Sequence, residues 1–284
     1  IDLNRDLFET DILNLKNSKL DKVLEKIRRE GKIVFSVLTE KSEDTEKIIP
    51  KKIKQISIYM QKENKVYSIE VSNEKEFTEK FREILENSKI QKFGHYLAED
   101  YVIFKQLGIT TEAIFYDVKI AAYDINPTDK YTIENLSVEY FNLYIDEYLE
   151  KRGITKEKNK QIDLFTGIEE DENNYDAIKN DLYSYCISKI YDVTSKKLEE
   201  ENLLDLFNNI EMPLVQVLGE MQFNGMPIDK DELVAFGNKL KEQIESLKQE
   251  IYKSVGEEFN INSTQQLGKI LFEKLKLPVY KKTK

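Results

Sequence analysis

Short apolar runs separated by polar turns dominate the first half of the chain. Residues 32–38 form such a run between a glycine and a charged segment, which is the pattern of a buried strand. Apolar and polar positions alternate at residues 56–60, and another apolar run follows at residues 66–71, so these segments predict two neighbouring strands. Two more short strands are predicted at residues 90–93 and 114–116.

Segments of helical periodicity lie between these strands. Residues 73–88 place their apolar side chains on one helical face, and Asn73 and Glu76 have the spacing of a capping box. Further helices are predicted at residues 97–107 and 118–125, the second of which ends before a proline. Strands that alternate with helices predict an α/β core around a mixed sheet.

The second half of the chain is predicted to be mostly helical from about residue 174, after a polar stretch at residues 150–174 that we expect to be a mobile connection. Asp229, followed three residues later by Glu232, marks the N-terminus of a long helix. Its apolar residues form a narrow seam: Leu233, Phe236, Leu240, Ile244, Leu247, Ile251 and Val255. Because such a seam is typical of helix pairs, we expect it to pack on another part of the chain, to pair with a second molecule, or to leave the region loosely ordered.

Composition favours a water-soluble protein with two structural units. The chain has 284 residues, 40% of them apolar and 34% charged, and contains no apolar run long enough to span a membrane. The N-terminus does not resemble a signal peptide. A single cysteine, Cys186, cannot form an internal disulfide bond. We therefore expect a cytoplasmic protein.

The net charge of −10 argues against a protein that coats nucleic acid without sequence preference, since such proteins present a basic surface to phosphates. The last segment differs, because residues 259–284 contain six lysines and a single acidic residue, Glu273. We expect this basic end to be the part that faces phosphates.

Three segments resemble the start of the polymerase domain of family A DNA polymerases of the bacterial polymerase I type. They are EMPLVQVLGEMQFNGMPID at residues 211–229, EFNINS at residues 258–263 and ILFEKLKLP at residues 270–278. The resemblance implies a DNA-directed DNA polymerase of replication and repair, which binds primer-template DNA and uses Mg²⁺. It also implies that the catalytic carboxylates lie further along the family's sequence, so we expect no polymerase chemistry and no cofactor in this part alone.

Residues 30–200 resemble the 3′-5′ exonuclease domain that precedes the polymerase domain in this family. The similarity is clearest in GHYLAED at residues 94–100 and FYDVKIAAYDINP at residues 115–127. It implies a ribonuclease H-like mixed sheet in residues 1–200, followed by an all-helical segment, residues 201–284, that begins the polymerase domain. Active members hold two divalent metals with four carboxylates.

The exonuclease motifs of the family are incomplete here. The first, Asp-Thr-Glu, aligns with Leu38-Thr-Glu40, so that leucine stands where a carboxylate bridges the two metals. The second motif keeps its carboxylate as Asp100. The third, Tyr-x-x-x-Asp, aligns with Cys186 and Ile190. Because leucine and isoleucine offer no oxygen ligand, we expect a domain without nuclease activity that acts as a scaffold, with no metal site.

The alternative hypothesis is an active exonuclease with a rearranged two-metal site built from Glu40, Asp100 and Asp117. Two literal motif matches bear on it. Residues 44–46 spell Asp-Thr-Glu but lie in a polar segment that we interpret as a loop. Tyr96 stands four residues before Asp100, in the position of the second motif, and we expect its ring to have a packing role.

Candidate DNA contacts lie near the C-terminal end of the sequence. By resemblance they are Asn262, Ser263, Lys281, Lys282 and Lys284, which would position a duplex without selecting its base sequence. Local chemistry gives simpler roles to other residues: Asn262 and Ser263 can also cap a helix, His95 is expected to be a hydrogen-bonded histidine, and Cys186 a buried apolar residue.

Overall fold

The computed structural model describes residues 6–43, 48–49, 51–155 and 173–278. Packing divides the chain into two compact units, Ile1–Gly225 and Met226–Lys284, and each is described by itself. The family boundary expected after residue 200 stays a prediction.

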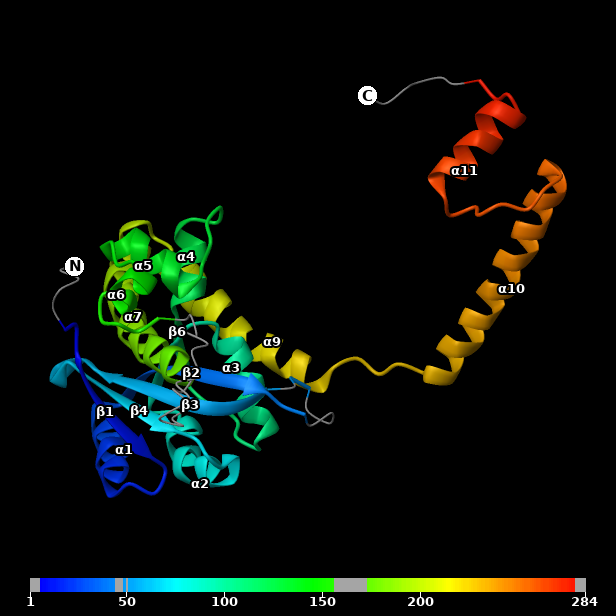
Figure 1. Ribbon diagram of the computed structural model, residues 1–284. Helices are drawn as coiled ribbons and strands as arrows, with labels where there is room; N and C mark the ends of the chain where they lie inside the picture. Colours follow the sequence, from blue (N-terminus) through cyan, green and yellow to red (C-terminus); the bar gives the residue numbers. More distant parts are fainter. Residues whose placement is uncertain (1–5, 44–47, 50, 156–172, 279–284) are drawn as a thin grey trace, which may run out of the picture. The chain divides into compact units, whose positions relative to one another are not determined.

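A mixed six-stranded sheet forms the centre of the first unit, within the described residues (Figure 1). Its order is β1-β4-β3-β2-β5-β6. Strands β2, β3 and β4 pair antiparallel, whereas β1 runs parallel to β4, and β2, β5 and β6 run parallel to one another. The strands are β1 (Glu9–Asn14), β2 (Lys32–Lys41), β3 (Lys51–Met60), β4 (Lys65–Glu70), β5 (Gln91–Gly94) and β6 (Ile114–Asp117). The predicted α/β class with a mixed sheet is confirmed.

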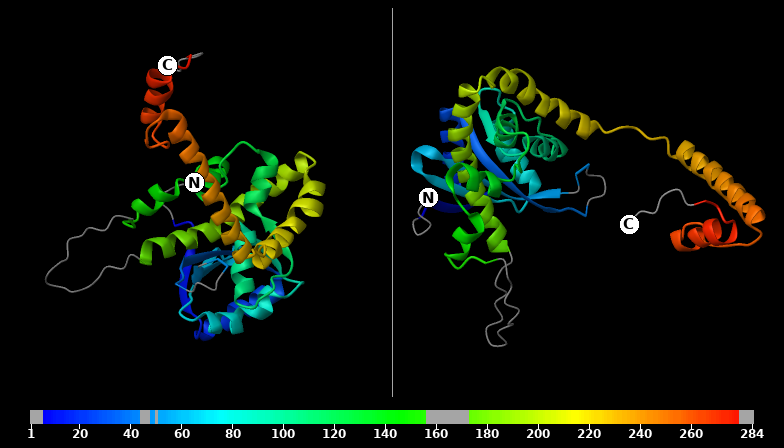
Figure 2. Two further views of the ribbon diagram at one scale, coloured as in Figure 1. Left: turned by 90° about the vertical axis from the view of Figure 1, so that its right-hand side faces the viewer. Right: turned by 90° about the horizontal axis from the view of Figure 1, so that it is seen from above.

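Helices cover both faces of this sheet. Figures 1 and 2 show α1 and α2 on one face and α7 across the other. The helical segments up to residue 200 are α1 (Ser18–Glu30), η1 (Gln61–Glu63), α2 (Glu74–Leu85), α3 (Leu97–Gln106), α4 (Val118–Ile125), α5 (Ile133–Phe141), α6 (Ile145–Glu150) and α7 (Asn173–Glu200). The stretch at residues 150–174, expected to be mobile, lies for the most part outside the described residues.

The N-terminus of α2 confirms its predicted cap. The Asn73 side chain accepts hydrogen bonds from the backbone N–H groups of Lys75, at 2.9 Å, and Glu76, at 3.2 Å. Four apolar side chains of the helix are fully buried, and the stacked rings of Phe77 and Phe81 lie 4.7 Å apart. The cap fixes where the helix begins, and its apolar face fixes which side meets the sheet.

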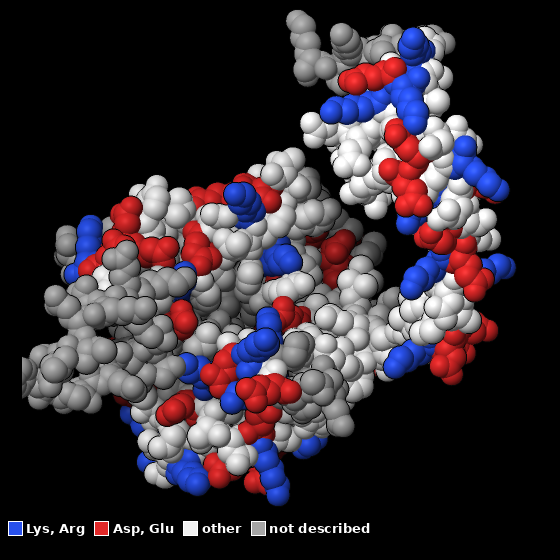
Figure 3. Space-filling model, turned by 45° about the vertical axis from the view of Figure 1, so that its right-hand side comes forward, with Lys and Arg blue, Asp and Glu red and all other residues white. Residues whose placement is uncertain are grey.

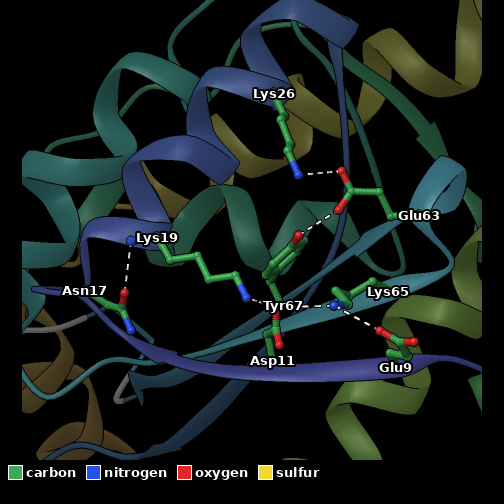
Figure 4. A network of polar contacts seen from close by, with 8 residues as sticks. All are labelled: Glu9, Asp11, Asn17, Lys19, Lys26, Glu63, Lys65 and Tyr67. Carbon is green, nitrogen blue, oxygen red and sulfur yellow. Dashed lines mark hydrogen bonds and ion pairs between the residues drawn. The ribbon is translucent and has the colours of Figure 1, made fainter.

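Ion pairs fasten the edge strand β1 to its neighbours (Figure 4). Lys65 of β4 lies 3.0 Å from Glu9 and 3.5 Å from Asp11, and Lys19 of α1 also binds Asp11. The hydrogen bond from Lys19 lowers the pKa of Asp11. Charged side chains on an edge strand also discourage pairing with foreign strands.

Three helical segments close the first unit: α8 (Leu204–Leu206), the π-helix η2 (Phe207–Glu211) and α9 (Met212–Asn224). Phe207 is buried with its ring centre 4.7 Å from that of Tyr116 in β6, and α9 contacts α3. This helical region therefore packs on the sheet domain.

The second unit contains α10 (Lys230–Val255), α11 (Thr264–Gly268) and the π-helix η3 (Lys269–Lys274). As predicted, Asp229 caps α10, accepting from the N–H groups of Asp231 and Glu232 at 3.0 Å. The predicted seam lies on the surface of this unit: its first six members, Leu233 to Ile251, are 39–63% exposed.

Candidate functional site

The first exonuclease motif lies at the end of β2. Leu38 is partly exposed, and Glu40, two residues on, is exposed. The Glu40 carboxylate lies 3.0 Å from the Nζ of Lys52, which lies opposite it near the start of the neighbouring strand β3. The pairing of β2 with β3 shifts register between Leu38 and Thr39, so the motif coincides with an irregularity in the sheet.

Asp100 lies in α3 and is partly buried. Burial raises its pKa well above the usual value, and the negative charges of Glu99 and Asp117 act in the same direction. Lys51, which forms an ion pair with Glu99, opposes the shift. The retained carboxyl group is therefore held where its ionised form is disfavoured.

Asp117 is 1% exposed and caps two helices at once. Its carboxylate accepts hydrogen bonds from the backbone N–H groups of Tyr96, Leu97 and Lys119, at 3.1, 2.7 and 2.9 Å. The first two lie at the N-terminal end of α3, at its N-cap and first residue, and the third belongs to α4. Tyr96, the residue before α3, has a φ of +61° and provides no side-chain cap, so Asp117 replaces one.

The third motif lies inside the core. Cys186 and Ile190 lie on adjacent turns of α7, and both side chains are 0% exposed. Burial raises the pKa of the Cys186 thiol to about 12, which fits the predicted role as a buried apolar residue. Ile190 accepts a hydrogen bond through its backbone carbonyl from Thr194, whose hydroxyl lies 2.9 Å from the Tyr116 hydroxyl.

The motif positions offer fewer metal-ligating side chains than the four carboxylates of active family members. Leu38 and Ile190 have no atom that can ligate a hard cation, and the Asp117 carboxylate already accepts three backbone N–H groups. Within the described ranges, no three His, Cys, Asp or Glu side chains are arranged so that they could hold a metal ion. The residues of the three motifs therefore do not fit a two-metal centre.

The two literal motif matches have different outcomes. Residues 44–46 lie outside the described residues. Tyr96 is 46% exposed, and the Nζ of Lys119 lies 3.8 Å from its ring centre. The Tyr96 ring therefore packs against a lysine at the surface and not in the core, and its backbone is left-handed, with a φ of +61°. His95 is hydrogen-bonded, as predicted, to the carbonyl of Tyr131 at 2.6 Å.

The candidate DNA contacts are only partly described. Ser263 caps α11, with its hydroxyl accepting from the N–H of Gln266 at 3.4 Å, and Asn262 is exposed beside it. Lys281, Lys282 and Lys284 lie outside the described residues. Figure 3 shows basic and acidic side chains intermixed over the face that it draws, in keeping with the modest net charge.

A buried polar cluster between β3 and α7 was not predicted. Ser57 donates to the Asp181 carboxylate at 2.6 Å, and Gln55 donates to it at 2.8 Å. Asn180 donates to Ser57 at 2.8 Å and accepts from Ser36 at 2.7 Å. Burial raises the pKa of Asp181 to about 6. No sequence motif marks these residues, because they come from three elements, β2, β3 and α7, and α7 lies more than 100 residues after the two strands.

Comparison with known families agrees with the α/β fold. Residues 14–162, more than half of the chain, match the family model of 3′-5′ exonucleases, and residues 230–284 match that of DNA polymerase family A. The chain belongs to the 3′-5′ exonuclease family, joined to sequence of family A DNA polymerases. The resemblance seen in the sequence is therefore confirmed.

Bacterial DNA polymerase I sequences are among the proteins similar to this chain. DNA polymerase I of Bacillus subtilis is 32% identical over 212 residues, which are 73% of this chain and 22% of that protein. The Caldicellulosiruptor bescii enzyme is 34% identical over 169 residues, 59% of this chain and 17% of that protein. DNA polymerase I of Bacillus caldotenax is 47% identical over 89 residues, 31% of this chain and 10% of that protein. The chain thus spans less than a quarter of the length of these relatives.

A solved structure shares the fold. The POL domain of Pol1 from M. smegmatis, in complex with DNA primer-template and dNTP, superimposes with a TM-score of 0.72 at 19% identity. The match covers 96% of this chain and 42% of that one.

In the described part of the chain, every helix is too short or too polar to span a lipid bilayer.

Proposed function

We propose that the exonuclease-like unit is a scaffold without metal-dependent 3′-5′ exonuclease activity. Leu38 carries the proposal, because an aliphatic side chain occupies the position at which the family bridges two metals. The burial of Cys186 and Ile190 and the use of Asp117 as a helix cap support it.

The scaffold would serve a DNA-directed DNA polymerase of replication and repair. The relatives named DNA polymerase I and the match of residues 230–284 support this assignment. The polymerase reaction and its Mg²⁺ would then belong to the longer protein. Primer-template DNA, with which the M. smegmatis domain is in complex, would contact Asn262, Ser263, Lys281, Lys282 and Lys284.

The exposed seam of α10 is proposed as a surface for another helix, either of the longer polymerase or of a second copy of this chain. Light scattering over a dilution series tests the second copy. A monomer at every concentration would exclude it, and a dimer that Ile244→Glu dissociates would support it.

A nuclease assay tests the proposed loss of activity. The chain is incubated with 3′-labelled single-stranded DNA and Mg²⁺ or Mn²⁺, beside an active 3′-5′ exonuclease as a positive control. We expect no shortening by the chain at any metal concentration. Stepwise shortening that Glu40→Ala and Asp100→Ala both abolish would overturn the proposal and establish the rearranged site.

A further inference from the structure

Helix α9 packs against α3 so closely at Gly219 that a larger residue there would collide with α3. The backbone of Gly219 faces the ring of Tyr101, and a Cβ atom at residue 219 would lie 2.5 Å from Cδ1 of that ring. The ring itself is 1% exposed, so it has no free space into which to turn. The glycine is therefore required for close packing, since its backbone has ordinary helical geometry.

Charge completes this contact one residue later. The Tyr101 hydroxyl donates to the Glu220 carboxylate, and the Nζ of Lys105 forms an ion pair with the same oxygen. These two hydrogen bonds, that of Lys105 first, lower the pKa of Glu220. The Lys105 Nζ also lies 5.7 Å from the ring centres of Tyr101 and Phe223. We call Tyr101, Lys105, Gly219 and Glu220 the α3–α9 latch.

Helix α9 has two apolar faces, and only one of them is buried. Met212, Val215 and Gly219 are buried, at the spacing of one helical face. Val217 and Leu218, on another face, are 52% and 49% exposed. Hydrophobic pattern alone does not distinguish these faces, whereas Gly219 and Glu220 make contacts with Tyr101 of α3.

We propose that the α3–α9 latch fixes α9 to the exonuclease-like unit, so that this unit holds the chain rigidly as far as Asn224. The inference rests on the proposed scaffold function and gives it a physical attachment point. Steric fit contributes more than charge here, because the side chains of Lys105 and Glu220 are 22% and 35% exposed and such ion pairs are weak.

Hydrogen–deuterium exchange of the whole chain tests the latch. In Gly219→Ala the added methyl group collides with Tyr101, and we expect the amides of Met212–Asn224 to exchange at least tenfold faster. Unchanged protection of β2, β3 and β4 would show that the unit remains folded. Gly237→Ala in α10 is the matched control, because a Cβ there meets nothing within 4 Å, and it should leave α9 exchange unchanged.

A double variant separates the latch from a general loss of stability. Tyr101→Leu removes both the ring and its hydroxyl, so adding Gly219→Ala to it should raise α9 exchange less than twofold further. Glu220→Gln should raise α9 exchange by itself. Wild-type exchange of α9 in both Gly219→Ala and Glu220→Gln, or full additivity in the double variant, would overturn the latch. Nuclease activity is a separate measurement, so activity with an intact latch would refute only the inert scaffold.

Discussion

Lys92 is a buried charged residue that lowers the stability of the fold. It lies in β5, between β2 and β6, with its side chain fully buried, and its Nζ donates to the carbonyl of Asn87 at 2.7 Å. Burial lowers its pKa to about 8. Between pH 8 and its ordinary value of 10.5, the unfolded chain binds more protons at this site than the folded one does, so its contribution to stability rises with pH.

We therefore predict that Lys92→Met raises the free energy of unfolding at pH 7 by about 1–3 kcal/mol. The variant loses the hydrogen bond to Asn87, which offsets about 1 kcal/mol of the gain. The advantage should shrink as the pH approaches 10.5. Urea unfolding at a series of pH values measures it, with Lys89→Met, an exposed site, as the control. A variant less stable than wild type at pH 7 would contradict this account.

Helix α7 contacts the sheet through the buried polar cluster around Asp181 as well as through its apolar side chains. Because the pKa of this carboxyl group is raised to about 6 in the folded state, the folded chain binds more protons here than the unfolded chain does between about pH 4 and 6. Its contribution to stability therefore falls as the pH rises through this range. Asp181→Asn keeps the Oδ1 atom that accepts from Gln55 and Ser57.

We predict that Asp181→Asn removes about 1–3 kcal/mol of pH dependence between pH 4 and 6. Thermal unfolding across this range measures the change. Asp176→Asn, on an exposed position of the same helix, should leave the pH profile within about 0.5 kcal/mol of wild type. Equal pH profiles for Asp181→Asn and wild type would show that the buried carboxyl group does not titrate in this window.

At the scale of the whole molecule, charge limits how the chain can bind DNA. A net charge of −10 leaves the basic end as the favoured contact. We predict weak, salt-dependent binding of primer-template DNA. The logarithm of the association constant falls as the logarithm of the salt concentration rises. Replacing Lys281, Lys282 and Lys284 by glutamine should make this slope shallower by about 2–3, since each phosphate contact contributes about 0.9.

Fluorescence anisotropy over a salt titration measures this slope. The control variant replaces Lys22, Lys75 and Lys89, three exposed lysines of the first unit, and carries the same change in net charge. If both triple variants weaken binding equally, net charge and not the basic end governs the interaction.

Local pattern accounts for much of the predicted fold. Asn73 and Asp229 cap the helices that their spacing predicted, because a cap depends on three or four consecutive residues. The predicted elements begin at residue 32, and β1 and α1 precede them. Leu20, Val23, Leu24 and Ile27 give α1 a clear helical pattern. In β1, by contrast, Ile12 is exposed and Leu13 buried among charged residues, because the strand depends on pairing with distant β4.

The sequence by itself determined the order of strands and helices between residues 32 and 125, the caps of α2 and α10, and the chemical character of Leu38 and Ile190. These features depend on side-chain type and on near neighbours. Only the tertiary structure decided that Asp117 caps two helices, that Tyr96 is exposed, that Lys92 and Asp181 are buried, and that Gly219 packs on Tyr101. Each of these depends on which residues, distant in the chain, share a small volume from which water is excluded, and no local pattern specifies that.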